Sequence, residues 1–441
     1  MRDRPTLESL CGAAAVRDPD PLTDRISSIL PPLVIEPSTP AQVAAVLGWA
    51  SDARRTVVIR GAGTRMGWGR VPEDVDLLLS TRGLNRIVAH ADGDLTATVE
   101  AGVPLATLNA ALARHGQCLP IDPPDRAGAT IGGLLATNES GPLRHRHGTP
   151  RDLVIGIEIA TPGGTIAKAG GRVVKNVAGY DLSKLMTGSF GSLAAIVSAT
   201  FKLTPIARES ATIRVGASDD RELAQLVSEL MLSQLDLAAC DLAVEFGVSA
   251  GSSVESHALL LKCTSLSSPV ATQVSDALAL CGAGRSVVFT GREAESLWAE
   301  HLSRRVTSLD IDPPVLDGSR QVPRGSTAPA IVRVSWMPAD LVRVLSEVRD
   351  SLHGLAGRLT GRAALGAGLV ALGGSTSDQV EAIARLRATT ALANVVLISG
   401  SAPLKERVDV WGPPPAAHAV FAMLKQAFDP AGILNAGRGP I

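Results

Sequence analysis

The chain has 441 residues, more than one hydrophobic core usually serves, so two or three domains are expected. Its 42 basic and 43 acidic residues leave a net charge of -1, which lacks the basic excess of a nucleic-acid binder. Apolar residues make up 45% of the chain and aromatic residues only 3%, so the core is expected to consist of Ala, Val, Leu and Ile.

The five cysteines are widely separated and form no C-x-x-C pair, so iron–sulfur clusters and structural zinc lack their usual ligand spacing. An odd, scattered set of cysteines suits a reducing cytoplasm. The N-terminus is charged, and no apolar run approaches the roughly 20 residues that cross a bilayer. We therefore expect a cytoplasmic protein without a transmembrane segment. Peripheral contact with the inner face of a membrane, made through partner proteins, is an alternative that the sequence does not exclude.

The first predicted elements are a strand at residues 33–36 and a helix that Ser38 or Thr39 can cap, with Pro40 in its first turn. A second strand, at residues 56–59, runs directly into the glycine-rich turn RGAGTR. Successive backbone N–H groups in such a turn can form a concave nest for phosphate oxygens, although a plain tight turn is the alternative. The turn is not a Rossmann fingerprint, because the second half of G-x-G-x-x-G is missing.

The stretch 122–201 holds 13 glycines between apolar runs. This density indicates that the backbone needs positive φ or lies close to a bulky ligand. Thr130 to Gly133 is expected to begin a short helix that presents its N–H groups forward. The H-x-H pair of His145 and His147 suggests a metal, but no third ligand lies nearby in sequence, so a basic loop near a phosphate is favoured over a metal site.

A strand at 153–160, a hairpin turn at 162–164, a helix capped by Asp181 and a β-rich run at 193–203 follow. From about Ile206 the pattern changes to alternating strand and helix segments. This alternation predicts an antiparallel sheet backed by helices.

Four motifs resemble, in the same order, the FAD-binding domain of the vanillyl-alcohol-oxidase or PCMH flavoprotein superfamily, and especially the FAD-binding E subunit of bacterial glycolate oxidase. They are RGAGT, DPPDRAGATIGGLLATNESGPLRHRHGTPRDLVIG, KNVAGYDLSKLMTGSFGSLAAIV and FDPAGILNAGR. The resemblance implies an α+β fold. After an N-terminal extension at 1–25, a PCMH-type FAD-binding domain of two α/β subdomains would occupy 26–206. An α+β cap domain with an antiparallel sheet would occupy 207–400, and a segment at 401–441 would return to the first domain.

The resemblance also implies the residues that bind the cofactor. The backbone N–H groups of Gly61 to Arg65 would hold the FAD pyrophosphate, Ile196 and Val197 would meet the adenine end, and Asn435 would return to the flavin. The full implied set is Arg60, Gly61, Ala62, Gly63, Thr64, Arg65, Asp122, Pro123, Thr130, Ile131, Gly132, Gly133, Asn138, Ser140, Gly141, His147, Gly148, Ile196, Val197 and Asn435. His147 stands where many relatives have tyrosine, NAGR replaces NPGR, and SLAAIV replaces TLGVI.

Noncovalent FAD is implied, because members of the superfamily with covalent flavin carry a histidine in the first glycine loop and this loop has none. A motif resembling H-x-G-D-G-N, the metal and base motif of related 2-hydroxy-acid dehydrogenases, is absent, so no catalytic residue is assigned.

The implied function is the oxidation of a small 2-hydroxy acid, glycolate to glyoxylate, by an FAD-dependent oxidoreductase. Its partners would be a paralogous catalytic flavoprotein and an iron–sulfur protein. One alternative is a self-sufficient D-2-hydroxy-acid dehydrogenase, in which Arg333 is a candidate carboxylate clamp, although a solvated arginine explains that residue as well. The other alternative is a noncatalytic FAD-binding scaffold.

Overall fold

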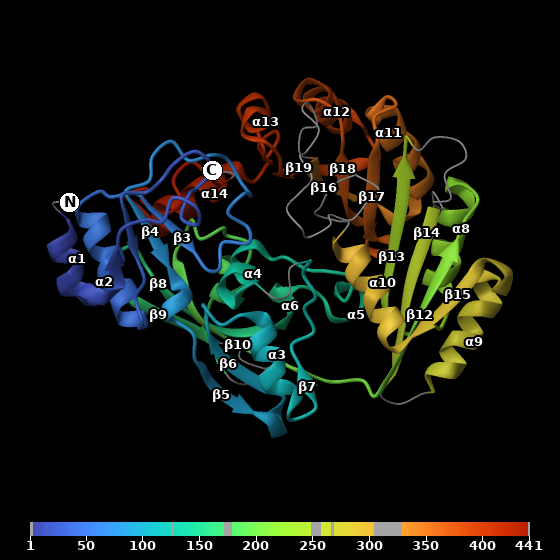
Figure 1. Ribbon diagram of the computed structural model, residues 1–441, viewed down its shortest axis with the longest axis horizontal. Helices are drawn as coiled ribbons and strands as arrows, with labels where there is room; N and C mark the ends of the chain where they lie inside the picture. The colour runs from blue at the N-terminus through green and yellow to red at the C-terminus, as the bar shows by residue number, and fades with distance from the viewer. Residues whose placement is uncertain are drawn as a thin grey trace. The chain divides into compact units, whose positions relative to one another are not determined.

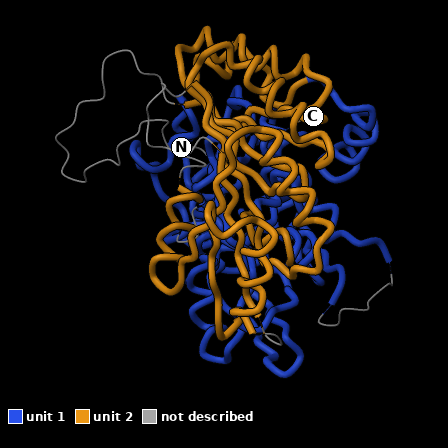
Figure 2. The backbone as a smooth tube through the Cα atoms, turned by 90° about the vertical axis from the view of Figure 1, so that its right-hand side faces the viewer, with its two compact units in different colours: residues 1–140, 147–206, 413–441 blue, residues 141–146, 207–412 orange. Residues whose placement is uncertain are grey.

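The computed structural model describes residues 3–124, 128–171, 179–247, 257–265, 269–303 and 329–439. The chain divides into two compact units, which Figure 2 distinguishes by colour. Unit 1 comprises residues 1–140, 147–206 and 413–441, and unit 2 comprises residues 141–146 and 207–412. Each unit is therefore built from segments that are far apart in the sequence.

The first sheet of unit 1 has four strands in the order β1-β2-β4-β3. Figure 1 labels β3 and β4 of this sheet. The parallel strands are β2 (Leu33–Ile35), β4 (Leu77–Ser80) and β3 (Val57–Arg60), and β1 (Val16–Arg17) runs antiparallel to β2. The helices α1 (Arg4–Cys11) and α2 (Pro40–Asp52) bury their apolar faces in one core with this sheet. α2 begins as predicted, because Thr39 caps it and Gln42 completes a capping box.

The second sheet of unit 1 is antiparallel, in the order β5-β6-β10-β8-β9. Its strands are β5 (Ile87–Ala91), β6 (Thr96–Glu100), β10 (Ala195–Lys202), β8 (Val154–Ala160) and β9 (Ile166–Gly170). The helices α3 (Leu105–Ala113) and α4 (Ile131–Thr137) pack against it in a second core. Shorter elements complete the unit: β7 (Gln117–Cys118), β11 (Thr204–Pro205), α6 (Pro150–Leu153) and α7 (Leu182–Met186). The short helix α5 (Arg144–His147) lies at the boundary, because residues 144–146 belong to unit 2. The predicted hairpin at 162–164 is confirmed, because it joins β8 to β9.

The C-terminal segment extends the first sheet. After α14 (His418–Phe428) the chain runs beside the edge strand β3, where the Val57 N–H donates to the Ile433 carbonyl at 2.8 Å and the Asn435 N–H donates to the Val57 carbonyl at 2.8 Å. The buried Asp429 holds the intervening turn, since its carboxylate accepts from the Leu434 N–H at 2.8 Å. Residues that follow α14 are thereby placed beside the turn at the end of β3.

Unit 2 is an eight-stranded antiparallel sheet in the order β15-β12-β14-β13-β17-β18-β16-β19. Its strands are β12 (Glu209–Gly216), β13 (Leu237–Phe246), β14 (His257–Ser265), β15 (Ser286–Thr290), β16 (Ala330–Trp336), β17 (Gly357–Arg362), β18 (Ala367–Leu372) and β19 (Leu392–Ser399). One large core joins the sheet to the helices α8 (Asp220–Leu232), α9 (Val270–Cys281), α11 (Leu341–Leu352) and α12 (Thr376–Ala388). The predicted antiparallel sheet backed by helices is confirmed.

Two further helices belong to unit 2. On the face opposite the large core, Trp298 of α10 (Gly291–Ser303) packs on Ala239 and Leu260 and donates to the Thr212 hydroxyl at 2.9 Å. α13 (Ala402–Arg407) also lies in unit 2, so the segment that rejoins unit 1 begins at residue 413. None of the helices among the described residues is both long and apolar enough to cross a bilayer.

Candidate functional site

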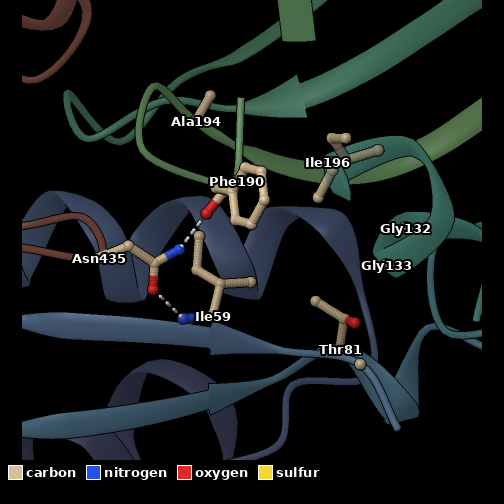
Figure 3. A pocket seen from close by; sticks show the side chains of 11 residues that line it. Ile59, Thr81, Gly132, Gly133, Phe190, Ala194, Ile196 and Asn435 are labelled. Carbon is tan, nitrogen blue, oxygen red and sulfur yellow. Dashed lines mark hydrogen bonds between the residues drawn. The ribbon is translucent and has the colours of Figure 1, made fainter. Parts of the chain in front are cut away.

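Two overlapping cavities lie in unit 1 where β3 ends. The first, of about 390 Å³, is shown in Figure 3, and six of its eleven lining residues are glycine or alanine. The second, of about 540 Å³, extends along the turn from Arg60 to Met66 and reaches Thr130, Thr137 and Arg438. The residues common to both are Ile59, Gly61, Gly133, Ala136, Phe190 and Asn435. The predicted glycine-rich turn and the first turn of α4 thus face one continuous space.

Asn435 closes one side of this site by joining two segments (Figure 3). Its Oδ1 accepts a hydrogen bond from the Ile59 N–H at 3.3 Å, and its Nδ2 donates to the Phe190 carbonyl at 2.5 Å. The backbone of Gly191 has φ +66°, and a Cβ there would lie 2.8 Å from Asn435 Nδ2. Glycine at 191 therefore lets the loop after Phe190 approach the C-terminal segment closely.

The turn after β3 lies equally close to α4. A Cβ on Gly61 would lie 2.1 Å from the Thr130 hydroxyl oxygen, so only glycine fits. The prediction that α4 presents its first N–H groups to a ligand is wrong for Ile131 and Gly132. These N–H groups donate to the carbonyls of Val103 and Ala101, at 3.0 and 2.8 Å, because the chain before α4 lies against the segment that follows β6.

Arg60 anchors the start of the turn through its side chain. Its guanidinium donates to the Thr23 carbonyl at 2.8 Å and to Asp24 at 2.5 Å, and Arg17 also donates to Asp24, at 2.6 Å. Burial of Asp24 would raise the pKa of its carboxyl group, but the hydrogen bonds from Arg17, the Asp20 N–H and Arg60 outweigh this effect and hold the pKa well below its usual value. Asp24 is consequently ionised wherever the protein is folded near neutral pH.

Two arginines bring positive charge to the second cavity. Arg438, 7% exposed, donates to the Met66 and Trp68 carbonyls at 2.8 and 2.9 Å, and burial lowers the pKa of its guanidinium to about 10, so the group stays protonated at neutral pH. Arg65 is bound to Glu139 at 2.6 Å, yet its buried Nη2 has no hydrogen-bond partner. Unpaired buried donors at a cavity indicate that a polar ligand completes the site.

The structure brings together about half of the predicted site residues. Those that line one or both cavities are Arg60, Gly61, Ala62, Gly63, Thr64, Arg65, Thr130, Gly132, Gly133, Ile196 and Asn435. Those that line neither cavity are Asp122, Pro123, Ile131, Asn138, Ser140, Gly141, His147, Gly148 and Val197. Ile131 and Val197 are buried in the two cores of unit 1, and Gly141 belongs to unit 2. Residues 125–127 and 175–178, which fall within two of the quoted motifs, lie outside the described residues.

Several lining residues were not among the predicted ones. They are Ile59, Met66, Thr81, Ala136, Thr137, Phe190, Gly191, Ala194 and Arg438. Phe190, Gly191 and Arg438 fall within the quoted motifs, so that signal was present, whereas no local pattern distinguishes Thr81 or Met66. Among the described residues, no group of three or more His, Cys, Asp and Glu side chains is placed to hold a metal ion.

Comparison with known proteins defines the class. Residues 31–170 match the family described as FAD binding domain. Alkyldihydroxyacetonephosphate synthase shares the fold over 92% of this chain and 77% of its own, with a TM-score of 0.66 at 15% identity. The protein therefore has the α+β, PCMH-type FAD-binding fold, and FAD is the cofactor of unit 1.

Three relatives are similar in sequence. D-lactate dehydrogenase of Archaeoglobus fulgidus is 34% identical over 47% of this chain and 46% of its own length. Glycolate oxidase subunit GlcD of Bacillus subtilis is 33% identical over 47% of this chain and 44% of its own. Glycolate oxidase subunit GlcE of Escherichia coli is 39% identical over 37% of this chain and 47% of its own. Each match spans less than half of the relative.

The residues of the two cavities fit FAD. The first cavity offers a flat ring an apolar space between Ile59, Ile196 and the small residues of α4, while the second offers phosphate groups a glycine-rich turn and the cations Arg65 and Arg438. The unpaired Arg65 Nη2 is the kind of donor that an anionic oxygen satisfies. No histidine, cysteine or tyrosine occurs among the described residues that line either cavity.

Proposed function

We propose that this chain is the FAD-binding subunit of a glycolate oxidase type of oxidoreductase, of the E-subunit kind. It takes part in the two-electron oxidation of a small 2-hydroxy acid, glycolate to glyoxylate, and passes the electrons from noncovalently bound FAD to a partner. The observation that carries the proposal is the match of residues 31–170 to the FAD binding domain, with a cavity at its glycine-rich turn. The names of two relatives as glycolate oxidase subunits supply the reaction class.

In this reaction the C2–H and O–H bonds of the hydroxy acid break, a C=O bond forms, and two electrons and two protons leave the substrate. Bound FAD supplies the acceptor for the electron pair. The chain's own residues hold the cofactor: the turn from Gly61 to Arg65 and Arg438 face its phosphates, and Asn435 fixes the loop at Phe190 against β3. No residue of this chain is assigned as the base that accepts the hydroxyl proton.

The residues around the cavity support the proposal that FAD is bound noncovalently. Covalent flavin needs a nucleophilic side chain, and the described lining residues include no histidine, cysteine or tyrosine. Precipitation of the flavin-loaded protein with acid is expected to leave the yellow colour in the supernatant. Colour that stays with the precipitated protein would contradict this part of the proposal.

The proposal is tested with the purified chain alone and, if neighbouring genes encode a similar flavoprotein and a two-cluster iron–sulfur protein, with the chain assembled with these two proteins. Alone, the chain is expected to take up FAD and to show an absorbance spectrum typical of a bound flavin. In the assembled complex, glycolate is expected to bleach the flavin and to reduce the clusters under anaerobic conditions. A chain that binds no FAD after gentle purification and addition of the cofactor would refute the proposal.

A second candidate is a self-sufficient FAD-dependent D-2-hydroxy-acid dehydrogenase, which the similarity to D-lactate dehydrogenase favours. Steady-state turnover of D-lactate or glycolate by the isolated chain with a dye acceptor would support it. A third reading, a scaffold that binds FAD without redox function, is separated by photoreduction of the bound flavin. A relay passes these electrons to the iron–sulfur partner, and a scaffold does not.

A further inference from the structure

Arg65 has one spare hydrogen-bond donor at the wall of the second cavity. Its Nε donates to Glu139 at 2.6 Å, its Nη1 donates to the Thr64 carbonyl at 2.8 Å, and its Cζ lies 5.6 Å from the centre of the Trp68 ring. Only Nη2 is left, and it is buried without a partner. These contacts fix the plane of the guanidinium, and Nη2 is its one nitrogen without a hydrogen-bond partner.

The charge around the cavity indicates what that ligand carries. The fifteen lining residues include Arg60, Arg65 and Arg438 and no aspartate or glutamate. Arg60 is neutralised by the buried Asp24, and Arg65 by Glu139. Arg438 adds a buried positive charge that is held by carbonyl oxygens. The site as a whole therefore favours an anion, and the unpaired donor of Arg65 favours an anionic oxygen over an aromatic ring.

We propose that the Arg65 side chain binds the diphosphate of FAD through Nη2, and that Glu139 and Trp68 position it for this contact. Arg65 would then determine specificity: it makes the site prefer the dinucleotide over a flavin without phosphate. This proposal rests on the binding of FAD stated above but not on the reaction. It adds a side-chain contact to the backbone N–H groups of the turn.

The test compares the affinities of Arg65→Met for FAD and for riboflavin, which lacks phosphate, with those of the native chain, measured by quenching of flavin fluorescence. A hydrogen bond to a charged group corresponds to roughly a tenfold to hundredfold loss of FAD affinity. Riboflavin affinity should stay within about twofold, because Met preserves the packing on Trp68. An equal loss for both flavins, or no loss for either, overturns the proposal.

Glu139→Gln is the matched control, because it keeps an oxygen acceptor for Arg65 Nε but removes the negative charge. If Arg65 contacts the diphosphate, this variant is expected to bind FAD as tightly as the native chain or more tightly. If the Arg65–Glu139 pair only joins two segments, both variants lose affinity and thermal stability together, which also overturns the proposal. Should Arg65→Met fold poorly, Arg65→Lys replaces it, and the ratio of FAD to riboflavin affinity is again expected to fall.

The outcomes also separate this proposal from the proposed function. If the native chain binds no FAD, the proposed function is refuted. If the native chain binds FAD but Arg65→Met keeps the native ratio of FAD affinity to riboflavin affinity, only the proposed role of Arg65 is refuted. If the ratio of FAD affinity to riboflavin affinity falls in Arg65→Met but no hydroxy acid is turned over, the proposed role of Arg65 is still supported.

Discussion

Single polar residues fix the segments that surround the FAD site. Asn435 connects Ile59 to Phe190 by its amide group alone, across 376 residues of sequence in the first case. Asp24 ties the turn after β3 to the N-terminal part of unit 1 through Arg60. In both places a buried polar side chain bonds groups from distant segments, so its removal leaves those groups without a hydrogen-bond partner.

Asn435 also has a positive φ of 45°, which distinguishes two substitutions. Asn435→Gly loses the amide contacts but keeps the backbone conformation, so we expect a loss of about 1–3 kcal/mol in the free energy of unfolding. Asn435→Ala should lose about 1 kcal/mol more, because alanine is strained at positive φ. Urea unfolding measures both, and both should weaken FAD binding. Equal stability of the two variants would show that backbone strain contributes nothing here.

Asp24 predicts a defined response to acid. Its folded-state pKa lies below the ordinary value of 3.8, so the ionised carboxylate stabilises the fold above pH 3.8, and this contribution is lost as the pH falls toward the folded-state pKa. Asp24→Asn should cost about 3 kcal/mol at neutral pH, because it leaves the buried Arg60 without its counter-ion.

The measurement is the free energy of unfolding between pH 6 and the acid limit of the fold. The native chain is expected to lose stability with acid more steeply than Asp24→Asn. The control is Asp18→Asn, because the Asp18 side chain is 85% exposed, and it should change stability by less than about 0.5 kcal/mol. Parallel acid profiles for the native chain and Asp24→Asn would contradict the assignment.

At the scale of elements, α4 packs closely on one side and leaves space on the other. A Cβ on Gly132 would lie 2.8 Å from the Ala101 Cβ, whereas a Cβ on Gly133 would meet within 4 Å only the Thr130 hydroxyl, at 3.3 Å. Gly132 is thus required by the contact of α4 with the end of β6. At Gly133 a methyl group would require only a small shift of the Thr130 hydroxyl group, and it would lie at the wall of the cavity.

These neighbouring glycines give opposite predictions. Gly133→Ala is expected to preserve or raise the stability of the flavin-free protein, by up to about 1 kcal/mol, because alanine favours the helix. It should lower FAD affinity by about tenfold or more, because the methyl group enters the cavity. Gly132→Ala should instead destabilise the flavin-free protein. Thermal unfolding and flavin titration of both variants check this, and tighter FAD binding by Gly133→Ala would be the contrary result.

At the scale of the whole molecule, the cavities of the FAD site and the largest hydrophobic core lie in different units. Both cavities of the FAD site are built from unit 1 alone, by the four segments 59–66, 130–137, 190–196 and 435–438 together with Thr81. Unit 2 carries its own large core between an antiparallel sheet and its helices. The chain crosses between the units at residues 140–141, 146–147, 206–207 and 412–413.

Hydrogen exchange is expected to show this division. FAD at 100 times its dissociation constant stabilises the binding-competent state by about 2.7 kcal/mol, so exchange should slow in the four segments of the site. The central strands of unit 2, β17 and β18, should keep the exchange rates of the flavin-free protein. Protection confined to unit 2, with none at the turn after β3, would place the cofactor elsewhere.

Local patterns in the chain were sufficient for the fold class and for part of the site. The cap at Thr39, the hairpin at 162–164 and the antiparallel sheet of unit 2 follow from residue types at short spacing, and the resemblance of the ordered motifs pointed to FAD, which the family match confirms. These features depend on neighbours within a few residues, which a sequence displays directly.

Other features depend on contacts between distant segments, and only the folded chain decides them. Ile196 packs in the second core of unit 1 and lines the cavity, whereas the adjacent Val197 is buried in the first core, because successive side chains of β10 point to opposite faces. The N–H groups at the start of α4 donate to the carbonyls of Ala101 and Val103. Gly141 belongs to unit 2. Arg65 and Glu139 meet across 74 residues, and that contact leaves one buried donor unpaired at the FAD site.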